Sequence, residues 1–304
     1  MSKQNPVNLS VELAGLDLAN PVMNASGTLG LESSEVVDFA EFGALVTKGV
    51  TLEPRSGNPT PRLCETSCGV INSIGLENSG LGVFLSDELP CWLSFGVPVI
   101  VNISGADVEE YVEISKALDK TGIAAIEVNI SCPNREGIII GTDAYRSCIL
   151  VDNVRQATSL PLIVKLTPNV TDIVGIAKSV ISSGADNLSL VNTFLAMDID
   201  IDSAKPKLRR GFGGLSGPSI MPQALFKVWQ VCQVVNVPVI GMGGISCFQD
   251  ACKFLMAGAS AVAVGTANFT NPLIIPRIIS DLERWMAKKG FNAICEIPQL
   301  NTNT

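Results

Sequence analysis

One short motif holds the side chains most able to do chemistry. In Asn129-Ile130-Ser131-Cys132-Pro133-Asn134, a thiol stands between two amide side chains. Pro133 cannot continue a strand ladder and restricts Cys132 to an extended or turn conformation. The chain has no histidine, so the commonest general base near neutral pH is missing and a thiolate could replace it. We predict that Cys132 is a catalytic base, whereas Cys232 and Cys252, in helical stretches, fit the ordinary alternative of an inert thiol.

The elements that must position this motif follow one rhythm, in which short apolar runs alternate with helical stretches. Such alternation is typical of parallel strands joined by crossover helices. Eight runs predict an α/β fold, a closed (β/α)₈ TIM barrel, with residues 1–304 as one domain. The runs cover residues 21–25, 44–48, 99–103, 124–130, 162–166, 187–192, 239–242 and 261–265. The clearest helical stretches cover residues 108–118, 172–183, 221–235 and 248–256.

Two features lie outside the alternation. Residues 9–13 and 16–18, joined through Ala14-Gly15, predict an N-terminal β-hairpin that closes the floor of the barrel. The interval 50–97, rich in Gly, Pro, Asn and Ser, is too long for a structureless connection in a compact domain. It predicts a long insertion after strand 2 with elements and a function of its own.

Polar residues or glycines follow every predicted strand, at the end where such barrels carry their active sites. They are Ser26-Gly27, Lys48, Asn102, Asn129, Lys165, Asn192-Thr193, Gly243-Gly244 and Gly265-Thr266. Core packing does not account for two lysines and three asparagines at matching positions, because lysine is almost never fully buried unpaired. We predict that these residues share one site.

The last two strands carry a phosphate signal. Gly241-Met242-Gly243-Gly244-Ile245 follows strand seven and Gly265-Thr266-Ala267 follows strand eight. Glycines let backbone N–H groups approach a phosphate, and barrels frequently bind phosphate in these two loops. A Gly-Gly pair can also be only a tight turn, but its placement favours a phosphorylated substrate or FMN.

The two lysines favour FMN, since an ammonium stabilises the negative charge of a reduced flavin. Lys165 is the candidate for the flavin ring, and Lys48 for a position near both flavin and substrate. The alternative is that both pair with structural carboxylates. Glu127 is the only acidic residue within the eight runs, which limits that alternative.

Composition restricts the partners. The formal net charge is -8 and no extended basic cluster occurs, so we expect no nucleic-acid binding. No apolar run reaches the roughly 18–20 residues of a membrane span, and the first residues lack the apolar core of a signal peptide. Nine scattered cysteines fit reduced thiols, and no second pair faces Cys64 and Cys68, so we expect no metal site. These features predict a cytoplasmic protein.

The chain resembles the class 1 dihydroorotate dehydrogenases, most closely the class 1B catalytic (FMN) subunit, over nearly its whole length. The stretches that carry the resemblance are 20–28, 47–51, 72–78, 129–134, 213–218, 241–245 and 257–269. The resemblance implies oxidation of dihydroorotate to orotate in pyrimidine biosynthesis. Cys132 then removes the C5 proton, while hydride passes from C6 to FMN. Class 2 enzymes use serine there and associate with membranes.

The resemblance also implies the remaining roles. The substrate-binding set is Lys48, Asn72, Gly75, Leu76, Asn129, Asn134, Asn192 and Thr193. The cofactor-binding set is Ala25, Ser26, Lys48, Asn102, Asn129, Lys165, Val191, Gly217, Gly243, Gly244, Gly265 and Thr266. The implied catalytic residues are Cys132 and Lys48, and Lys48 lies between substrate and flavin. The implied assembly is a homodimer, or a heterotetramer with a second subunit that carries FAD and a [2Fe-2S] cluster and passes electrons to NAD.

Three stretches depart from the class 1B pattern. The loop 135–143 contains three consecutive isoleucines where a glycine-richer loop is expected. Glu77 replaces an expected glutamine, and its carboxylate would repel an anionic substrate unless it points away or pairs with a cation. Arg209-Arg210-Gly211-Phe212 replaces a small, polar approach to the Gly-Gly-Leu-Ser-Gly turn.

Other functions remain open at this point. An FMN subunit that acts on dihydrouracil or dihydrothymine would share the barrel and the thiol. A class 1A enzyme would pass its electrons to fumarate, and a non-catalytic FMN-binding subunit would not depend on Cys132.

Overall fold

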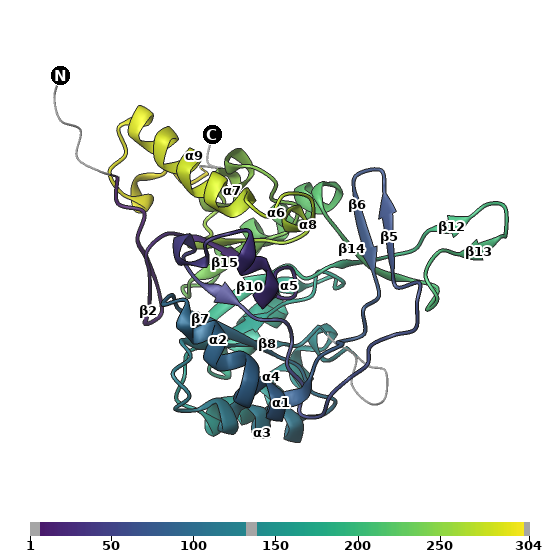
Figure 1. Ribbon diagram of the computed structural model, residues 1–304. Helices are drawn as coiled ribbons and strands as arrows, with labels where there is room; N and C mark the ends of the chain where they lie inside the picture. Colours follow the sequence, from purple (N-terminus) through teal and green to yellow (C-terminus); the bar gives the residue numbers. More distant parts are fainter. Residues whose placement is uncertain (1–6, 132–138, 301–304) are drawn as a thin grey trace.

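The computed structural model describes residues 7–131 and 139–300, and a parallel barrel forms its centre (Figure 1). Its strands are hydrogen-bonded in the order β3-β16-β15-β10-β9-β8-β7-β4. The barrel strands are β3 (Val22–Asn24), β4 (Leu45–Val46), β7 (Val99–Ile103), β8 (Ala125–Asn129), β9 (Leu162–Lys165), β10 (Asn187–Leu190), β15 (Val239–Met242) and β16 (Ala261–Val264). All eight predicted strands are present, so the predicted (β/α)₈ barrel is confirmed.

The barrel closes between its first two strands through a side chain as well as a backbone bridge. Met23 pairs with Ala44 in a parallel bridge. The fully buried Asn24 donates from Nδ2 to the Val46 carbonyl at 2.7 Å and accepts at Oδ1 from the Val46 N–H at 2.9 Å. One amide thus provides the donor and the acceptor that a longer β4 would have supplied.

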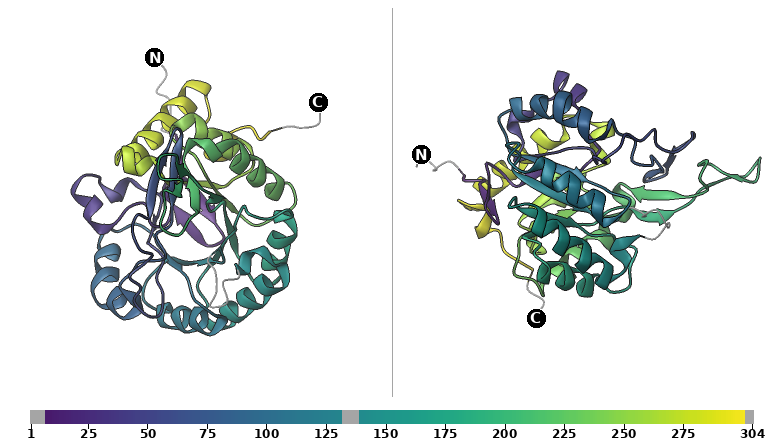
Figure 2. Two further views of the ribbon diagram at one scale, coloured as in Figure 1. Left: turned by 90° about the vertical axis from the view of Figure 1, so that its right-hand side faces the viewer. Right: turned by 90° about the horizontal axis from the view of Figure 1, so that it is seen from below.

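Helices surround the strands in a ring, which Figure 2 shows from the side of the antiparallel strands. The longer ones are α3 (Val108–Leu118), α4 (Ala144–Ala157), α5 (Ile173–Ser182), α6 (Met221–Cys232), α7 (Phe248–Met256) and α9 (Ile274–Lys289). The four helical stretches predicted from the sequence are confirmed. The side chains of Asp107, Asp143 and Asp172 accept first-turn N–H groups and so fix where α3, α4 and α5 begin.

Alternation along the strands separates two apolar regions. On β8, Ile126 and Val128 face the helices, whereas Ala125 lies in the smaller apolar cluster inside the barrel. The predicted hairpin is present as β1 (Val11–Leu13) and β2 (Leu16–Leu18). Its three leucines belong to the interior cluster, which confirms that the hairpin closes the floor.

The insertion after β4 has its own elements, as predicted. It contains β5 (Leu63–Thr66), β6 (Gly69–Asn72), α1 (Gly80–Val83), a π-helical turn (Phe84–Glu88) and α2 (Leu89–Ser94). Its strands join β11 (Phe194–Ala196) and β14 (Gly213–Ser216) in an antiparallel sheet ordered β11-β14-β6-β5. A small hairpin, β12 (Ile199–Asp200) with β13 (Lys205–Pro206), extends beyond that sheet (Figure 1). No sequence pattern indicates the strands between residues 194 and 216.

Candidate active site

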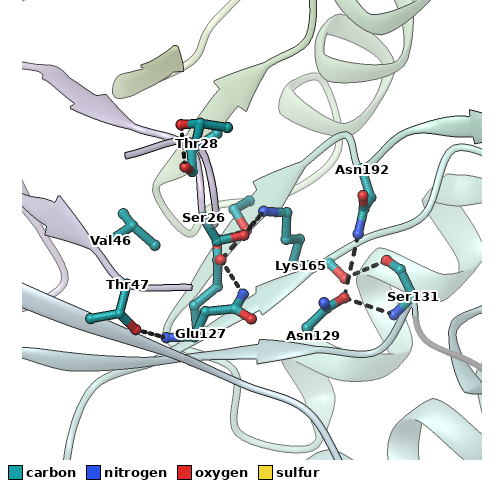
Figure 3. A network of polar contacts seen from close by, with 12 residues as sticks. Ser26, Thr28, Val46, Thr47, Glu127, Asn129, Ser131, Lys165 and Asn192 are labelled. Atoms are coloured by element: carbon teal, nitrogen blue, oxygen red, sulfur yellow. Dashed lines mark hydrogen bonds and ion pairs between the residues drawn. The ribbon is translucent and has the colours of Figure 1, made fainter. Parts of the chain in front are cut away.

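A buried polar layer crosses the barrel directly below its mouth (Figure 3). Lys165 on β9 donates from Nζ to Ser26 Oγ at 2.9 Å and lies 3.4 Å from Glu127 Oε2. Asn102 on β7 donates from Nδ2 to the same carboxylate oxygen at 2.5 Å. The layer therefore brings together three residues that the sequence assigned to the cofactor: Ser26, Asn102 and Lys165.

Glu127 is the member of this layer that the sequence did not assign to the site. It lies on β8 between β7 and β9, and only 3% of the residue is exposed. Its Oε1 accepts from Ser189 Oγ on β10 at 2.7 Å. The carboxylate thus links three strands besides its own. A signal was present, because Glu127 is the only acidic residue in the eight predicted strands, but the sequence does not show that it meets Lys165.

A second polar group lies at the ends of β8 and β10. Asn129 Oδ1 accepts from the Ser131 N–H at 3.1 Å and from Asn192 Nδ2 at 3.4 Å. The Asn129 carbonyl accepts from the hydroxyl of Tyr111 on α3 at 2.7 Å, and this tyrosine is fully buried. The structure therefore brings together Asn129 and Asn192, both predicted substrate residues.

The glycine turns after β15 and β16 leave backbone donors open. Gly243 and Gly244 have φ values of 125° and 78°, which L-residues rarely adopt. A Cβ atom on Gly265 would meet nothing closer than Ala25 Cβ at 3.7 Å, so the backbone there can be approached by a ligand. Among the described residues, no acceptor takes the N–H groups of Gly243, Gly244, Gly265 or Thr266. Open backbone donors at the ends of two neighbouring strands suit a phosphate.

These turns also have a packing requirement. A Cβ on Gly243 would lie 2.6 Å from Ala224 Cβ, and one on Gly244 would lie 2.6 Å from Met221 Cβ, both on α6. A Cβ on Gly217, whose φ is 100°, would lie 2.8 Å from Gly69 Cα. The tight-turn explanation therefore holds for these glycines, and it does not compete with the phosphate explanation.

Lys48 lies at the rim of the mouth and is exposed. Its Nζ is 3.8 Å from Glu77 Oε2, whereas Arg62 Nη2 is 2.6 Å from that oxygen. The hydrogen bond from Arg62 holds the pKa of the Glu77 carboxyl below its ordinary value, and the Lys48 charge adds to this effect. Glu77 thus pairs with two cations. These positive charges offset the repulsion that its carboxylate would otherwise exert on an anionic substrate.

The insertion carries its predicted site residues to the end of β4. Gly75 and Leu76 have φ values of 82° and 58°. Asn78 Nδ2 fixes this turn by donating to the Leu76 carbonyl at 2.7 Å. A Cβ on Gly49 would lie 3.5 Å from Leu76 Cδ2 and 3.0 Å from Asn102 Oδ1, so Leu76 lies beside the barrel layer. Asn72 on β6 instead donates to the Gly214 carbonyl at 3.2 Å.

Asn169 is a second residue that the sequence did not single out. It donates from Nδ2 to the Thr193 carbonyl at 3.0 Å and accepts at Oδ1 from the Leu195 N–H at 2.9 Å. The side chain therefore holds the segment after β10, where the predicted substrate residues Asn192 and Thr193 lie. The adjacent Val191 donates its N–H to the Met242 carbonyl.

Cys132 and Asn134, with residues 135–138 of the 135–143 loop, lie outside the described residues. The eight described cysteines are free. Burial raises the pKa of Cys252 to about 11 and that of Cys232 to about 12, which fits the inert role expected of them. Among residues 7–131 and 139–300, no group of three potential ligands could hold a metal ion, and no helix is long and apolar enough to cross a membrane.

The fold and the site define a class: barrel enzymes whose mouth offers backbone donors to a phosphate and a buried lysine to a cofactor or substrate. Residues 8–286 match the family model described as dihydroorotate dehydrogenase. The chain is 50% identical to the dihydroorotate dehydrogenase B (NAD(+)) catalytic subunit of Desulforamulus reducens, over 96% of this chain and 97% of that one.

Proteins of the same name from Geotalea daltonii and Caldicellulosiruptor bescii are each 48% identical to this chain. The alignments cover 95% and 96% of this chain and 97% and 98% of those proteins. The chain belongs to the dihydroorotate dehydrogenase family, which is a family of flavoprotein oxidoreductases. The resemblance to class 1B catalytic subunits is thereby confirmed.

Proposed function

We propose that this chain is the catalytic subunit of an NAD-linked dihydroorotate dehydrogenase, which oxidises (S)-dihydroorotate to orotate in pyrimidine biosynthesis. The observation that carries the proposal is the polar layer of Lys165, Glu127 and Asn102, which lies at the barrel mouth of a chain about 50% identical to such subunits. The absence of histidine leaves a thiol as the natural base.

FMN is the flavin that the site fits. Its phosphate would meet the N–H groups of Gly243, Gly244, Gly265 and Thr266, which have no acceptor among the described residues. Lys165 uses two of its three N–H donors on Ser26 and Glu127, which leaves one for the anionic part of a flavin. The remaining predicted cofactor residues are Ala25, Lys48, Asn102, Asn129, Val191 and Gly217. When bound, FMN supplies an acceptor for two electrons.

The residues of this chain divide the rest of the work. Cys132, assigned on the sequence alone, takes the C5 proton of dihydroorotate as hydride leaves C6. Asn129 and Asn192, held together at 3.4 Å, offer amides that both donate and accept, which suits a ring of alternating carbonyl and N–H groups. Lys48 attracts the anionic substrate, and Asn72, Gly75, Leu76, Asn134 and Thr193 complete the proposed substrate set.

The relatives are named as catalytic subunits, so they form part of larger assemblies. For this chain we propose a partner that carries FAD and a [2Fe-2S] cluster and delivers electrons to NAD. The proposed assembly is a homodimer that joins two such partners in a heterotetramer, in the cytoplasm. Neither FAD nor the cluster would be bound by this chain.

Anaerobic mixing of the flavin-loaded protein with dihydroorotate tests the activity. Bleaching of the flavin absorbance is expected with dihydroorotate and not with dihydrouracil, which lacks the carboxylate. Cys132→Ala should slow the bleaching at neutral pH by roughly 10²–10⁴-fold while FMN stays bound, the usual size of a general acid–base contribution.

Cys68→Ala is the matched control, because Cys68 is exposed in the turn between β5 and β6. It should bleach at the wild-type rate. Unchanged bleaching in Cys132→Ala would remove the proposed base, and bleaching by dihydrouracil alone would replace the proposed substrate.

A further inference from the structure

The carboxylate of Glu127 stands at the centre of the buried layer, between the two side chains assigned to the cofactor. On the sheet, Asn102 is the direct partner of Glu127 across β7 and β8. Asn129, two residues further along β8, is the direct partner of Lys165 on β9. Glu127 therefore points into the barrel one step below Asn129, and above the apolar cluster that includes Ala125 and Ile163.

Packing does not explain a charge at this position. A buried, ionised carboxylate is costly unless it is paired and hydrogen-bonded, and Glu127 meets that condition. Its Oε2 accepts hydrogen bonds from Asn102 Nδ2 at 2.5 Å and from Lys165 Nζ at 3.4 Å. Its Oε1 accepts from Ser189 Oγ at 2.7 Å. Replacing the whole layer by apolar residues would fill the same space without this cost.

The contacts of Glu127 leave defined groups free at the mouth. Because the carboxylate accepts from Asn102 Nδ2, the Oδ1 atom of the same amide faces Gly49. There this oxygen can accept a hydrogen bond from a ligand. The carboxylate also accepts a hydrogen bond from Lys165 Nζ. This bond holds the ammonium next to Ser26 and leaves one N–H donor of the ammonium free. The pair also has no net charge, so the ligand faces a balanced ion pair and not a lone cation.

We propose that Glu127 is a positioning residue for the flavin, which fixes Lys165 and Asn102 and offsets the ammonium charge, so that it lowers the reduction potential of the bound cofactor. This inference rests on the proposed function, because it requires that a flavin occupies the mouth. A lone cation favours the anionic reduced flavin more strongly than a balanced pair does. Loss of the carboxylate charge should therefore make the flavin easier to reduce.

Glu127→Gln isolates the charge. One amide oxygen can replace Oε2 as the acceptor for Asn102 and Lys165, and the amide N–H₂ can donate to Ser189 Oγ, which is able to accept. The variant thus keeps the hydrogen-bond pattern and removes the negative charge. The measurement is made at pH 7.

The experiment is a redox titration of FMN-loaded protein against a dye of known potential. For Glu127→Gln we expect the two-electron reduction equilibrium to shift about tenfold toward reduced flavin, which is ~30 mV upward. Glu113→Gln, an exposed residue on α3, is the matched control with the same charge change and should leave the potential unchanged. An unchanged potential in Glu127→Gln with flavin bound would overturn the proposal and leave only a structural ion pair.

Glu127→Asp covers the case in which the glutamine variant does not fold. It keeps the charge but withdraws it by one methylene, so the potential should stay near that of the wild type while the affinity for FMN falls several-fold. A potential shift as large as that of a charge removal, or unchanged affinity for FMN, would overturn the proposal. The wild-type protein distinguishes failure of the proposed function from failure of this inference. If the wild-type protein does not bind FMN, both are wrong. If it binds FMN but the Glu127 variants give the contradicting results, only the role of Glu127 is wrong and the proposed oxidation of dihydroorotate stands.

Discussion

Two lysine–glutamate pairs serve the same barrel mouth under opposite conditions of solvation. The side chains of Lys165 and Glu127 are 5% and 3% exposed, and those of Lys48 and Glu77 are 50% and 43% exposed. Removing one partner of a buried pair leaves an uncompensated charge, whereas an exposed pair contributes about 0–1 kcal/mol. The buried pair is therefore a fixed part of the site, and the exposed pair is free to exchange partners when an anion arrives.

The strongest test of this contrast is Lys165→Met, which keeps most of the apolar stem and removes the ammonium. Glu127 would then be buried without its counter-charge, and we expect the free energy of unfolding to fall by about 3–5 kcal/mol. Urea unfolding of the flavin-free protein measures this loss, and a fluorescence titration should show weaker FMN binding.

Lys253→Met provides the comparison on the surface. Lys253 forms an ion pair with Asp250 at 3.1 Å but is itself 52% exposed, so its loss should cost less than about 1 kcal/mol. Equal losses in the two variants would contradict the distinction between the buried and exposed pairs.

Asn169→Ala should have the second largest effect. It removes the partner of the Thr193 carbonyl and of the Leu195 N–H. Leaving such groups unsatisfied costs about 1–3 kcal/mol where they are shielded from water. Because the segment after β10 carries Asn192 and Thr193, the KM for dihydroorotate should rise more than kcat falls.

Asn169→Asp is the control that divides this effect. An aspartate still accepts from the Leu195 N–H, but it places a carboxylate oxygen against the Thr193 carbonyl in place of the donated hydrogen bond, so its KM should be at least as high as that of Asn169→Ala if the bond to Thr193 matters. Wild-type kinetics in Asn169→Ala would show that the segment after β10 holds its shape without this side chain.

The buried and exposed regions also differ in how well the sequence predicts them. Lys165 and Asn102 could be assigned because each lies at or next to the end of a strand whose pattern is strong, and strand ends meet at one mouth. Glu127 could not, because its role depends on which strands are neighbours: the β7-β8-β9 order places its carboxylate between two residues 25 and 38 positions away. The eight strands follow from local patterns, whereas this contact is a property of the closed barrel.

The rim shows a second limit of the sequence. Glu77 could be identified as a carboxylate in need of a cation, but Arg62 could not be identified as that cation. Arg62 reaches Glu77 because β5 and β6 form a hairpin that returns the chain to the mouth. The antiparallel partner of that hairpin, β14, comes from residues 213–216, whose glycine-rich sequence has no strand pattern. Long-range pairing of an irregular segment is not encoded in its local periodicity.

At the rim, Lys48→Ala should separate binding from stability. The free energy of unfolding should change by less than about 1 kcal/mol, because the Lys48–Glu77 pair is solvated and Arg62 still satisfies the carboxylate. The KM for the anionic substrate should rise several-fold, and the rise should shrink at high salt as screening weakens the attraction in the wild type. A loss of stability comparable to that in Lys165→Met would show that the Lys48–Glu77 pair stabilises the fold as much as the buried pair does. It would contradict the distinction between the two pairs.

The smallest expected effect is the pH dependence at Glu77. Arg62 holds the folded-state pKa of this carboxyl below its ordinary value, so the stabilisation from the pair is present above the ordinary carboxyl pKa of about 4.3. It is lost as the pH falls through the lower folded-state pKa, where Glu77 takes up a proton. Glu77→Gln should therefore be slightly less stable than the wild type at neutral pH, and the difference should vanish in acid. Urea unfolding of both proteins from pH 7 down to the acid limit of folding measures this convergence. A difference that persists or widens at low pH would mean that Glu77 stabilises the insertion by packing and not by its charge.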